Sequence, residues 1–100
     1  MAIKNACYAI NNFQLTGCQI YASCEPCPMC LAAIYWARIG KIYFANTKKM
    51  AAGIGFIDSF IYRELRRSLK KRSLPTVRLK LPEAKFAFEE WVRKKDKIRY

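Results

Sequence analysis

The segment that most constrains this chain is Cys24–Cys30, with the sequence Cys-Glu-Pro-Cys-Pro-Met-Cys. A predicted strand leads into it, and a predicted helix leads out of it. Pro28 suits the first position of that helix, where its missing N–H removes no hydrogen bond. Cys27 then lies at the helix start and Cys30 one turn later on the same face. Backbone N–H groups and the helix dipole favour thiolates there, and two such thiolates supply half of a tetrahedral zinc site.

Three kinds of site use cysteines at this spacing. A thioredoxin-type redox pair also places Cys-x-x-Cys at a helix start, although this chain lacks a full βαβ unit before the motif. An iron–sulfur cluster needs a fourth cysteine soon afterwards, and none follows Cys30. Zinc deaminases combine His-x-Glu with a later Pro-Cys-x-x-Cys, and residues 26–30 have the form of that second half. Spacing alone leaves the redox pair open, and the rest of the chain favours the zinc deaminase.

The composition indicates one small globular domain over residues 1–100, because 53% of the chain is hydrophobic. The longest uncharged apolar run near the motif, 29–37, is too short to cross a membrane. Residues 1–13 contain no hydrophobic block of a signal peptide. We therefore expect a cytoplasmic protein without a membrane partner, whose five cysteines are reduced or metal-bound rather than paired as disulfides.

The net charge of +12 permits nucleic acid as a partner. However, the cations concentrate in two short stretches, 63–72 and 93–99, and are not interleaved with exposed aromatic residues. A solvated basic surface is the favoured interpretation, and nucleic-acid binding is the alternative.

The hydrophobic periodicity predicts alternating helices and strands. We predict helices over 1–12, 28–38, 59–69 and from 82 onward, and strands over 18–23, 41–45 and 76–81. The first two strands and the helix between them form a βαβ unit, so these strands should be parallel. The third alternates apolar and polar residues, which predicts an edge strand with one wet face. Residues 46–55 are predicted to be a loop.

This order of elements predicts an α/β layered fold. Three strands make a thin sheet, and the first helix opens on Met1 with no capping residue before it. We therefore expect that an N-terminal part of the domain is missing. Such a loss would expose a strand edge, so poor stability or self-association is also expected.

Four segments carry a family resemblance: 23–30, 33–38, 55–62 and the terminal Lys-x-x-Tyr of 97–100. They resemble bacterial guanine deaminases, members of the cytidine deaminase-like superfamily. The first segment is shared by the whole superfamily, and the others are more specific to guanine deaminases. The resemblance runs from Met1 to Tyr100.

The resemblance implies a cytidine deaminase-like α/β/α layered sheet. This chain would be the C-terminal two-thirds of one deaminase domain, holding the last three strands and flanking helices and lacking the first two strands. It implies zinc-dependent hydrolysis of guanine to xanthine and ammonia, in which a zinc-bound water attacks the base. The implied partners are guanine, or a related nucleobase, and a second copy of the chain.

The resemblance also implies roles for individual residues. Cys27 and Cys30 match two thiolate ligands of Zn²⁺. Asp58 matches a carboxylate that is placed against the guanine and takes part in proton transfer. Trp36 matches a residue lining the base pocket. Tyr100 matches a tyrosine that closes the neighbouring subunit's site in a homodimer with swapped C-terminal segments.

Three of these residues also have ordinary roles available. Asp58 can cap the helix that Ser59 begins, a contribution of about 1 kcal/mol. Trp36 can be a core residue, and Tyr100 can be a simple chain end.

The absence of histidine is the main departure from the family. The resemblance implies a histidine ligand and a glutamate proton shuttle in a His-Ala-Glu motif, which would lie just before Met1. Two thiolates alone leave zinc under-coordinated. We therefore expect no useful deaminase activity from this chain alone. The alternatives are a relative of the tRNA or nucleic-acid adenosine deaminases, and a non-catalytic remnant that acts through binding.

Overall fold

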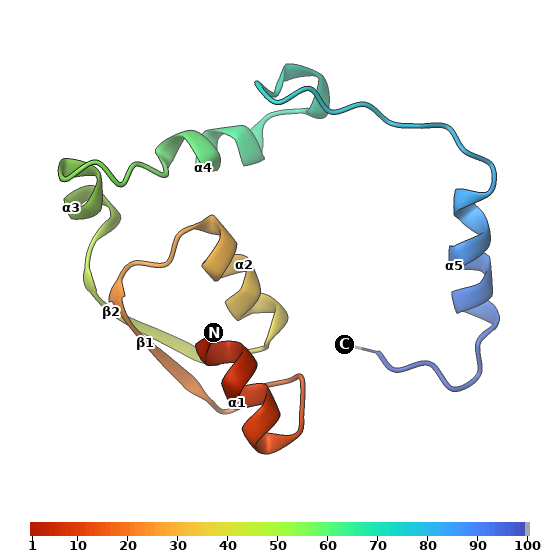
Figure 1. Cartoon of the computed structure of the whole chain (residues 1–100), viewed down its shortest axis with the longest axis horizontal. Helices are drawn as coiled ribbons and strands as arrows, with labels where there is room; N and C mark the ends of the chain where they lie inside the picture. The colour runs from red at the N-terminus through yellow and green to blue at the C-terminus, as the bar shows by residue number, and fades with distance from the viewer. Residues whose placement is uncertain (100) are drawn as a thin grey trace. The chain divides into compact units, whose positions relative to one another are not determined.

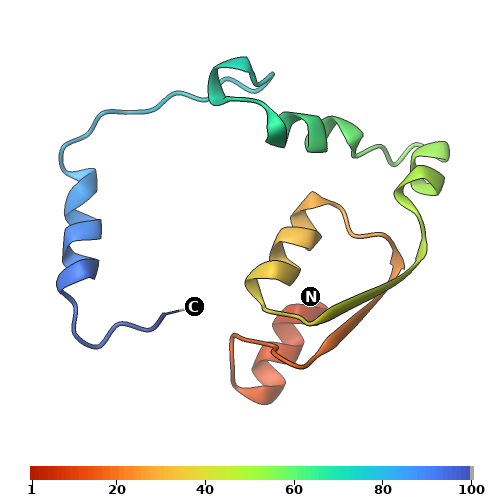
Figure 2. The same ribbon diagram turned by 180° about the vertical axis from the view of Figure 1, so that it is seen from behind.

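A computed structural model describes residues 1–99, which fall into two compact units that join between Arg66 and Arg67. The first unit contains α1 (Ala2–Ile10), β1 (Gln19–Cys24), α2 (Pro28–Trp36), β2 (Lys41–Asn46), α3 (Lys48–Gly53) and α4 (Ser59–Arg66). The second unit contains the short 3₁₀ helix η1 (Leu69–Lys71) and the helix α5 (Ala84–Arg93). Figure 1 shows these elements coloured along the chain, and Figure 2 shows them from behind.

The centre of the first unit is the predicted βαβ motif. β1 and β2 are parallel, with Gln19 opposite Lys41, and α2 makes the crossover between them (Figure 1). On the exposed face of this pair, the rings of Tyr21 and Tyr43 stack with centroids 4.8 Å apart. Such cross-strand aromatic pairs help to fix the register. The predicted parallel pairing is therefore confirmed.

A small core lies where α2 meets the chain on either side of it. The buried hydrophobic residues of the described chain are Leu15, Ile34 and Ala37. The backbone N–H of Leu15 donates to the carbonyl of Ala37 at 2.7 Å, and that of Gly40 donates to Cys18 at 3.0 Å. These bonds tie the entry to β1 against the exit from α2, so the direction of α2 is fixed relative to the strands.

The first helix is also present, over Ala2–Ile10. It ends at Asn11, whose φ of 51° is left-handed, and the N–H of Asn12 donates back to the Cys7 carbonyl at 3.1 Å. Asparagine tolerates this conformation better than most residues, which explains why the helix ends there.

Two predictions about secondary structure were wrong. The segment 46–55 was predicted to be a loop, but it contains α3, where the Thr47 hydroxyl accepts the N–H of Met50 at 3.2 Å. Residues 76–81 were predicted to be a strand, but the strands of residues 1–99 are β1 and β2. The alternation of apolar and polar residues in 76–81 gives the segment one apolar and one polar face. A strand also needs a neighbouring strand whose backbone accepts and donates its hydrogen bonds. Instead, Leu81 donates locally to the Leu79 carbonyl at 3.1 Å.

The other helices differ from prediction mainly at their ends. The predicted helix 59–69 ends at Arg66, and the last helix begins at Ala84 rather than at Pro82. Within residues 1–99, no helix is both long enough and apolar enough to span a bilayer.

Candidate metal and base site

The cysteine motif adopts the geometry that its sequence predicts. Cys27 is the N-cap residue of α2, with φ −69° and ψ 169°, and Pro28 occupies the first helical position. The carbonyl of Cys27 accepts the first helical hydrogen bond, from the N–H of Leu31 at 2.8 Å. Cys30 follows within the first turn, so the two thiols lie close together at the start of the helix.

The helix start also separates the acidities of the two thiols. The backbone N–H of Cys30 donates to the sulfur of Cys27, and this bond lowers the pKa of the Cys27 thiol. The side-chain hydrogen bond with Cys27 raises the pKa of Cys30, because the Cys30 thiol is the donor in that bond. The pair therefore favours a first thiolate on Cys27, which is the form that binds metals.

Cys27 and Asp58 line the same cavity, which has a volume of about 390 Å³. That volume lies in the usual range for small-ligand sites, roughly 300–1,000 Å³. Asp58 is half-buried and directly precedes α4, where its carbonyl accepts the N–H of Tyr62 at 3.2 Å. The remaining lining residues come from the cysteine motif, α3 and the segment after α3: Cys24, Glu25, Lys48, Ala51, Gly55, Phe56 and Ile57.

Polar contacts join the cysteine motif to the two helices that follow β2. The carboxylate of Glu25 accepts the backbone N–H of Lys48, the first residue of α3, at 3.1 Å. The hydroxyl of Tyr62 on α4 donates to the carbonyl of Pro26 at 3.4 Å. The ammonium of Lys48 lies 4.6 Å from the centre of the Tyr62 ring, within the range of a cation–π contact.

The pKa of the Tyr62 hydroxyl is raised by its position beside this cavity. Burial raises the pKa of its hydroxyl, and the negative charges of Asp58, Glu25 and Cys27 raise it further. Sequence reasoning did not single out Glu25, Lys48 or Tyr62. Two of them stood within segments that already carried the resemblance, so their position in those motifs was the available signal.

Two further residues, Trp36 and Tyr100, were assigned to the base site by resemblance. Trp36 is the last residue of α2, is 61% exposed and does not line the cavity that holds Cys27 and Asp58. Tyr100 lies outside the described residues. Their roles in binding the base remain predictions.

The residues of this chain do not complete a zinc site. No cluster of three or more His, Cys, Asp or Glu side chains within residues 1–99 is arranged to hold a metal ion, and the sequence contains no histidine. Cys27 and Cys30 are two donors of the right kind, whereas a zinc site in proteins almost always has at least three protein ligands. Cys27 and Cys30 would therefore supply two of the four ligands of a tetrahedral zinc site.

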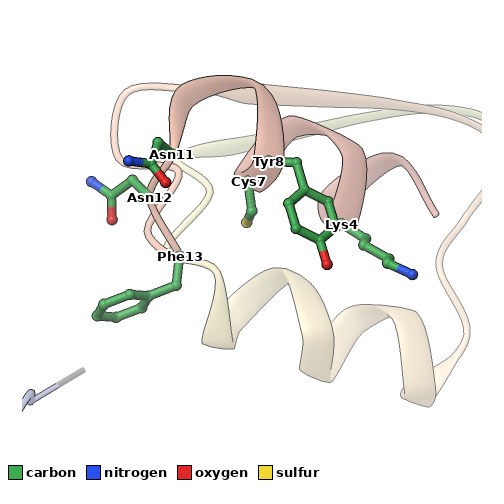
Figure 3. A pocket seen from close by; sticks show the side chains of 6 residues that line it. All are labelled: Lys4, Cys7, Tyr8, Asn11, Asn12 and Phe13. Carbon is green, nitrogen blue, oxygen red and sulfur yellow. The ribbon is translucent and has the colours of Figure 1, made fainter.

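A second hollow, about 460 Å³ in volume, lies beside α1 and is shown in Figure 3. It is lined by Lys4, Cys7, Tyr8, Asn11, Asn12 and Phe13. Lys4, Cys7 and Tyr8 extend from α1, and Phe13 extends from the loop that follows it (Figure 3). This hollow contains one cysteine and no acidic side chain, so it lacks the donor pair and the carboxylate that distinguish the first cavity.

Comparison with known proteins connects this geometry to one class. Residues 1–46 match the cytidine and deoxycytidylate deaminase zinc-binding region. The guanine deaminase of Bacillus subtilis (strain 168) is 44% identical over 90 residues, which are 90% of this chain and 58% of that protein. A tRNA-specific adenosine deaminase of Aquifex aeolicus (strain VF5) is 41% identical over 54 residues, covering 54% of this chain and 36% of that protein.

The fold shows the same relationship. The crystal structure of guanine deaminase from Bacillus subtilis superposes with a TM-score of 0.94 at 42% sequence identity. The match covers 99% of this chain and 63% of the solved one. The chain thus spans somewhat over half the length of the guanine deaminase it matches.

The chain therefore has the cytidine deaminase-like fold, and its first 46 residues are similar to the zinc-binding region of that class of deaminases. It is a homologue of bacterial guanine deaminase. Both the fold class and the resemblance predicted from the sequence are confirmed.

Proposed function

We propose that this chain is the cysteine-bearing part of a zinc-dependent guanine deaminase, which hydrolyses guanine to xanthine and ammonia in cytoplasmic purine metabolism. The observation that supports this most strongly is that Cys27 and Asp58 line one cavity of ligand size. In this proposal Cys27 and Cys30 bind Zn²⁺, and the Asp58 carboxylate contacts the base and takes part in proton transfer. Trp36 and Tyr100 complete the base pocket.

The proposal includes a second copy of the chain. We propose a homodimer in which each C-terminal segment, ending in Tyr100, closes the base site of the partner. The reducing cytoplasm suits the motif, because none of the five cysteines forms a disulfide in this structure and Cys27 and Cys30 would bind zinc as thiolates. The resemblance implies a histidine as the third zinc ligand, and the sequence contains no histidine, so we propose that the chain alone is inactive.

Replacing Asp58 with asparagine is expected to weaken guanine binding by this chain about 10- to 100-fold, as for loss of a hydrogen bond to a charged group. Guanine affinity is measured by calorimetry with Zn²⁺ present, xanthine is assayed in the same samples, and sedimentation velocity gives the mass of the binding species. Asp96→Asn, the same change at an exposed residue of the second unit, is the control. Equal affinities for Asp58→Asn and native chain would contradict the role of Asp58, and xanthine formation would contradict the proposed inactivity.

Nucleic-acid binding is a second candidate, because the structure supplies an aromatic neighbour that the sequence pattern had not indicated. In the second unit, Arg78, Lys80 and Lys85 line a hollow of about 520 Å³ together with Phe88, whose side chain is 77% exposed. Cations beside an exposed aromatic ring are the arrangement that binds single-stranded nucleic acid, through phosphate contact and base stacking.

If this second candidate is right, single-stranded RNA should bind with an affinity that falls steeply as salt rises. Lys80→Gln should then reduce the slope of log affinity against log salt by roughly 0.7, the contribution of one phosphate contact. Fluorescence anisotropy of a labelled oligonucleotide measures both quantities, and Lys4→Gln in the first unit is the control. Binding that does not change with salt would exclude this candidate.

A further inference from the structure

The segment that carries Asp58 has little packing of its own. Between α3 and α4 the side chains of Ile54, Phe56 and Ile57 are 76%, 72% and 63% exposed. Gly55 has a φ of 101°, a conformation that other residues rarely adopt. Few buried contacts usually mean low local stability. The position of Asp58 at the cavity that Cys27 also lines must therefore depend on the elements at the two ends of this segment.

The two ends are anchored to two adjacent residues, Glu25 and Pro26, which immediately precede Cys27. At the α3 end, the Glu25 carboxylate accepts the N–H of Lys48 at 3.1 Å. At the α4 end, the Tyr62 hydroxyl donates to the Pro26 carbonyl at 3.4 Å. The Lys48 ammonium, 4.6 Å from the Tyr62 ring centre, links the two anchors to each other.

The anchored residues are themselves held by the end of the sheet. The N–H of Glu25 donates to the carbonyl of Asn46 at 2.8 Å, and the side-chain amide of Asn46 donates to the carbonyl of Ser23 at 3.1 Å. These bonds join Glu25 to the ends of β1 and β2, so its carboxylate extends from backbone that is hydrogen-bonded to the sheet. A positioning group must itself be held if it is to keep a loop in one place.

We propose that Glu25 and Tyr62 are positioning residues that hold Asp58 at the cavity it shares with Cys27, by anchoring α3 and α4 to the two residues that precede Cys27. The effect of this placement of Asp58 on guanine binding rests on the guanine deaminase function proposed above. Placement of a reacting or binding group within the productive geometry contributes strongly to affinity and rate, and small displacements are costly.

The test compares backbone order in the full 100-residue chain labelled with ¹⁵N. The variants are Tyr62→Phe, which deletes only the hydroxyl, Glu25→Ala, and the two combined. Glu25→Gln keeps a side-chain oxygen that can accept the Lys48 N–H. Tyr35→Phe makes the same hydroxyl deletion at a 71% exposed residue of α2 and is the control. Order parameters are measured for 54–58 and, as an internal reference, for the strand 19–24.

In the combined variant, order parameters over 54–58 are expected to fall from about 0.85 to below about 0.6, the values of ordered and flexible backbone. The strand 19–24 should stay ordered in every variant. Tyr35→Phe should not change 54–58, and Glu25→Gln should restore the order that Glu25→Ala removes. Order over 54–58 that persists in the combined variant would overturn the proposal, as would an equal loss of order in the strand.

Guanine affinity, measured on the same samples, tests the proposed function separately. A native chain that binds guanine should lose about tenfold in affinity with Tyr62→Phe, the loss expected for one hydrogen bond. A native chain that binds no guanine would count against the proposed function, while the order parameters would still decide whether Glu25 and Tyr62 position Asp58.

Discussion

Zinc binding by this chain is expected to be lost when Cys27 is replaced with serine. A serine hydroxyl stays protonated near neutral pH and is not a zinc ligand, so the variant would retain one thiolate of the pair. The native chain should itself bind zinc more weakly than a complete site, because no group of three or more candidate ligand side chains is arranged to hold a metal ion within residues 1–99. Complete structural sites reach about 10–16 kcal/mol of binding free energy in small peptides. With half the donors, we expect a dissociation constant that is raised by several orders of magnitude.

Competition with a chromophoric chelator measures this affinity, and the charge-transfer band of cobalt bound in place of zinc reports whether thiolates are the ligands. Cys7→Ser is the matched control, since Cys7 is a half-buried cysteine of α1 outside the motif. Its affinity should equal that of the native chain. If Cys27→Ser and Cys7→Ser bound zinc equally well, the metal would lie elsewhere and the assignment of the motif would be wrong.

The local geometry of the motif could be predicted from the sequence because it depends on neighbours along the chain. Pro28 favours a helix start by its fixed φ and missing N–H, and that start places Cys27 at the N-cap and Cys30 one turn on. The parallel pairing of β1 and β2 likewise follows from a strand, a helix and a strand of ordinary length.

The errors come from two different causes. α3 was not predicted because Gly53 and Gly55 favour a loop, although Thr47 is a good N-cap residue and helix-forming residues follow it. The segment 76–81 fails as a strand for a reason that its own residues do not contain. Its alternation is regular, but no neighbouring strand bonds to it within the described chain.

The proximity of Asp58 to Cys27 required the family resemblance and could not come from periodicity. The two residues are brought together by contacts between distant parts of the chain, those of Glu25 with Lys48 and of Tyr62 with Pro26. A carboxylate and a phenol at those positions are ordinary surface residues in any sequence pattern. Only the fold shows that Glu25, within the cysteine motif, contacts α3 and that Tyr62 of α4 contacts Pro26 of the same motif.

Replacing Ile34 with alanine is expected to unfold the first unit or to lower its melting temperature by at least about 10 °C. The side chain of Ile34 is 4% exposed and is the largest contribution of α2 to a core shared with Leu15 and Ala37. Truncating a buried aliphatic residue to alanine costs about 2–5 kcal/mol, and each kcal/mol lowers the melting temperature of a domain this small by about 4–8 °C. A core of this size has few other contacts with which to offset the loss.

Circular dichroism during heating measures the transition, and Tyr35→Ala is the control, at the adjacent position of the same helix with a 71% exposed side chain. Surface substitutions of this kind usually change stability by less than about 0.5 kcal/mol. Because Cys27 caps α2 and Cys30 lies in its first turn, Ile34→Ala should also weaken zinc binding although neither cysteine is changed. Equal melting temperatures for Ile34→Ala and Tyr35→Ala would show that α2 does not depend on this core, and the position of the cysteine pair would then need another explanation.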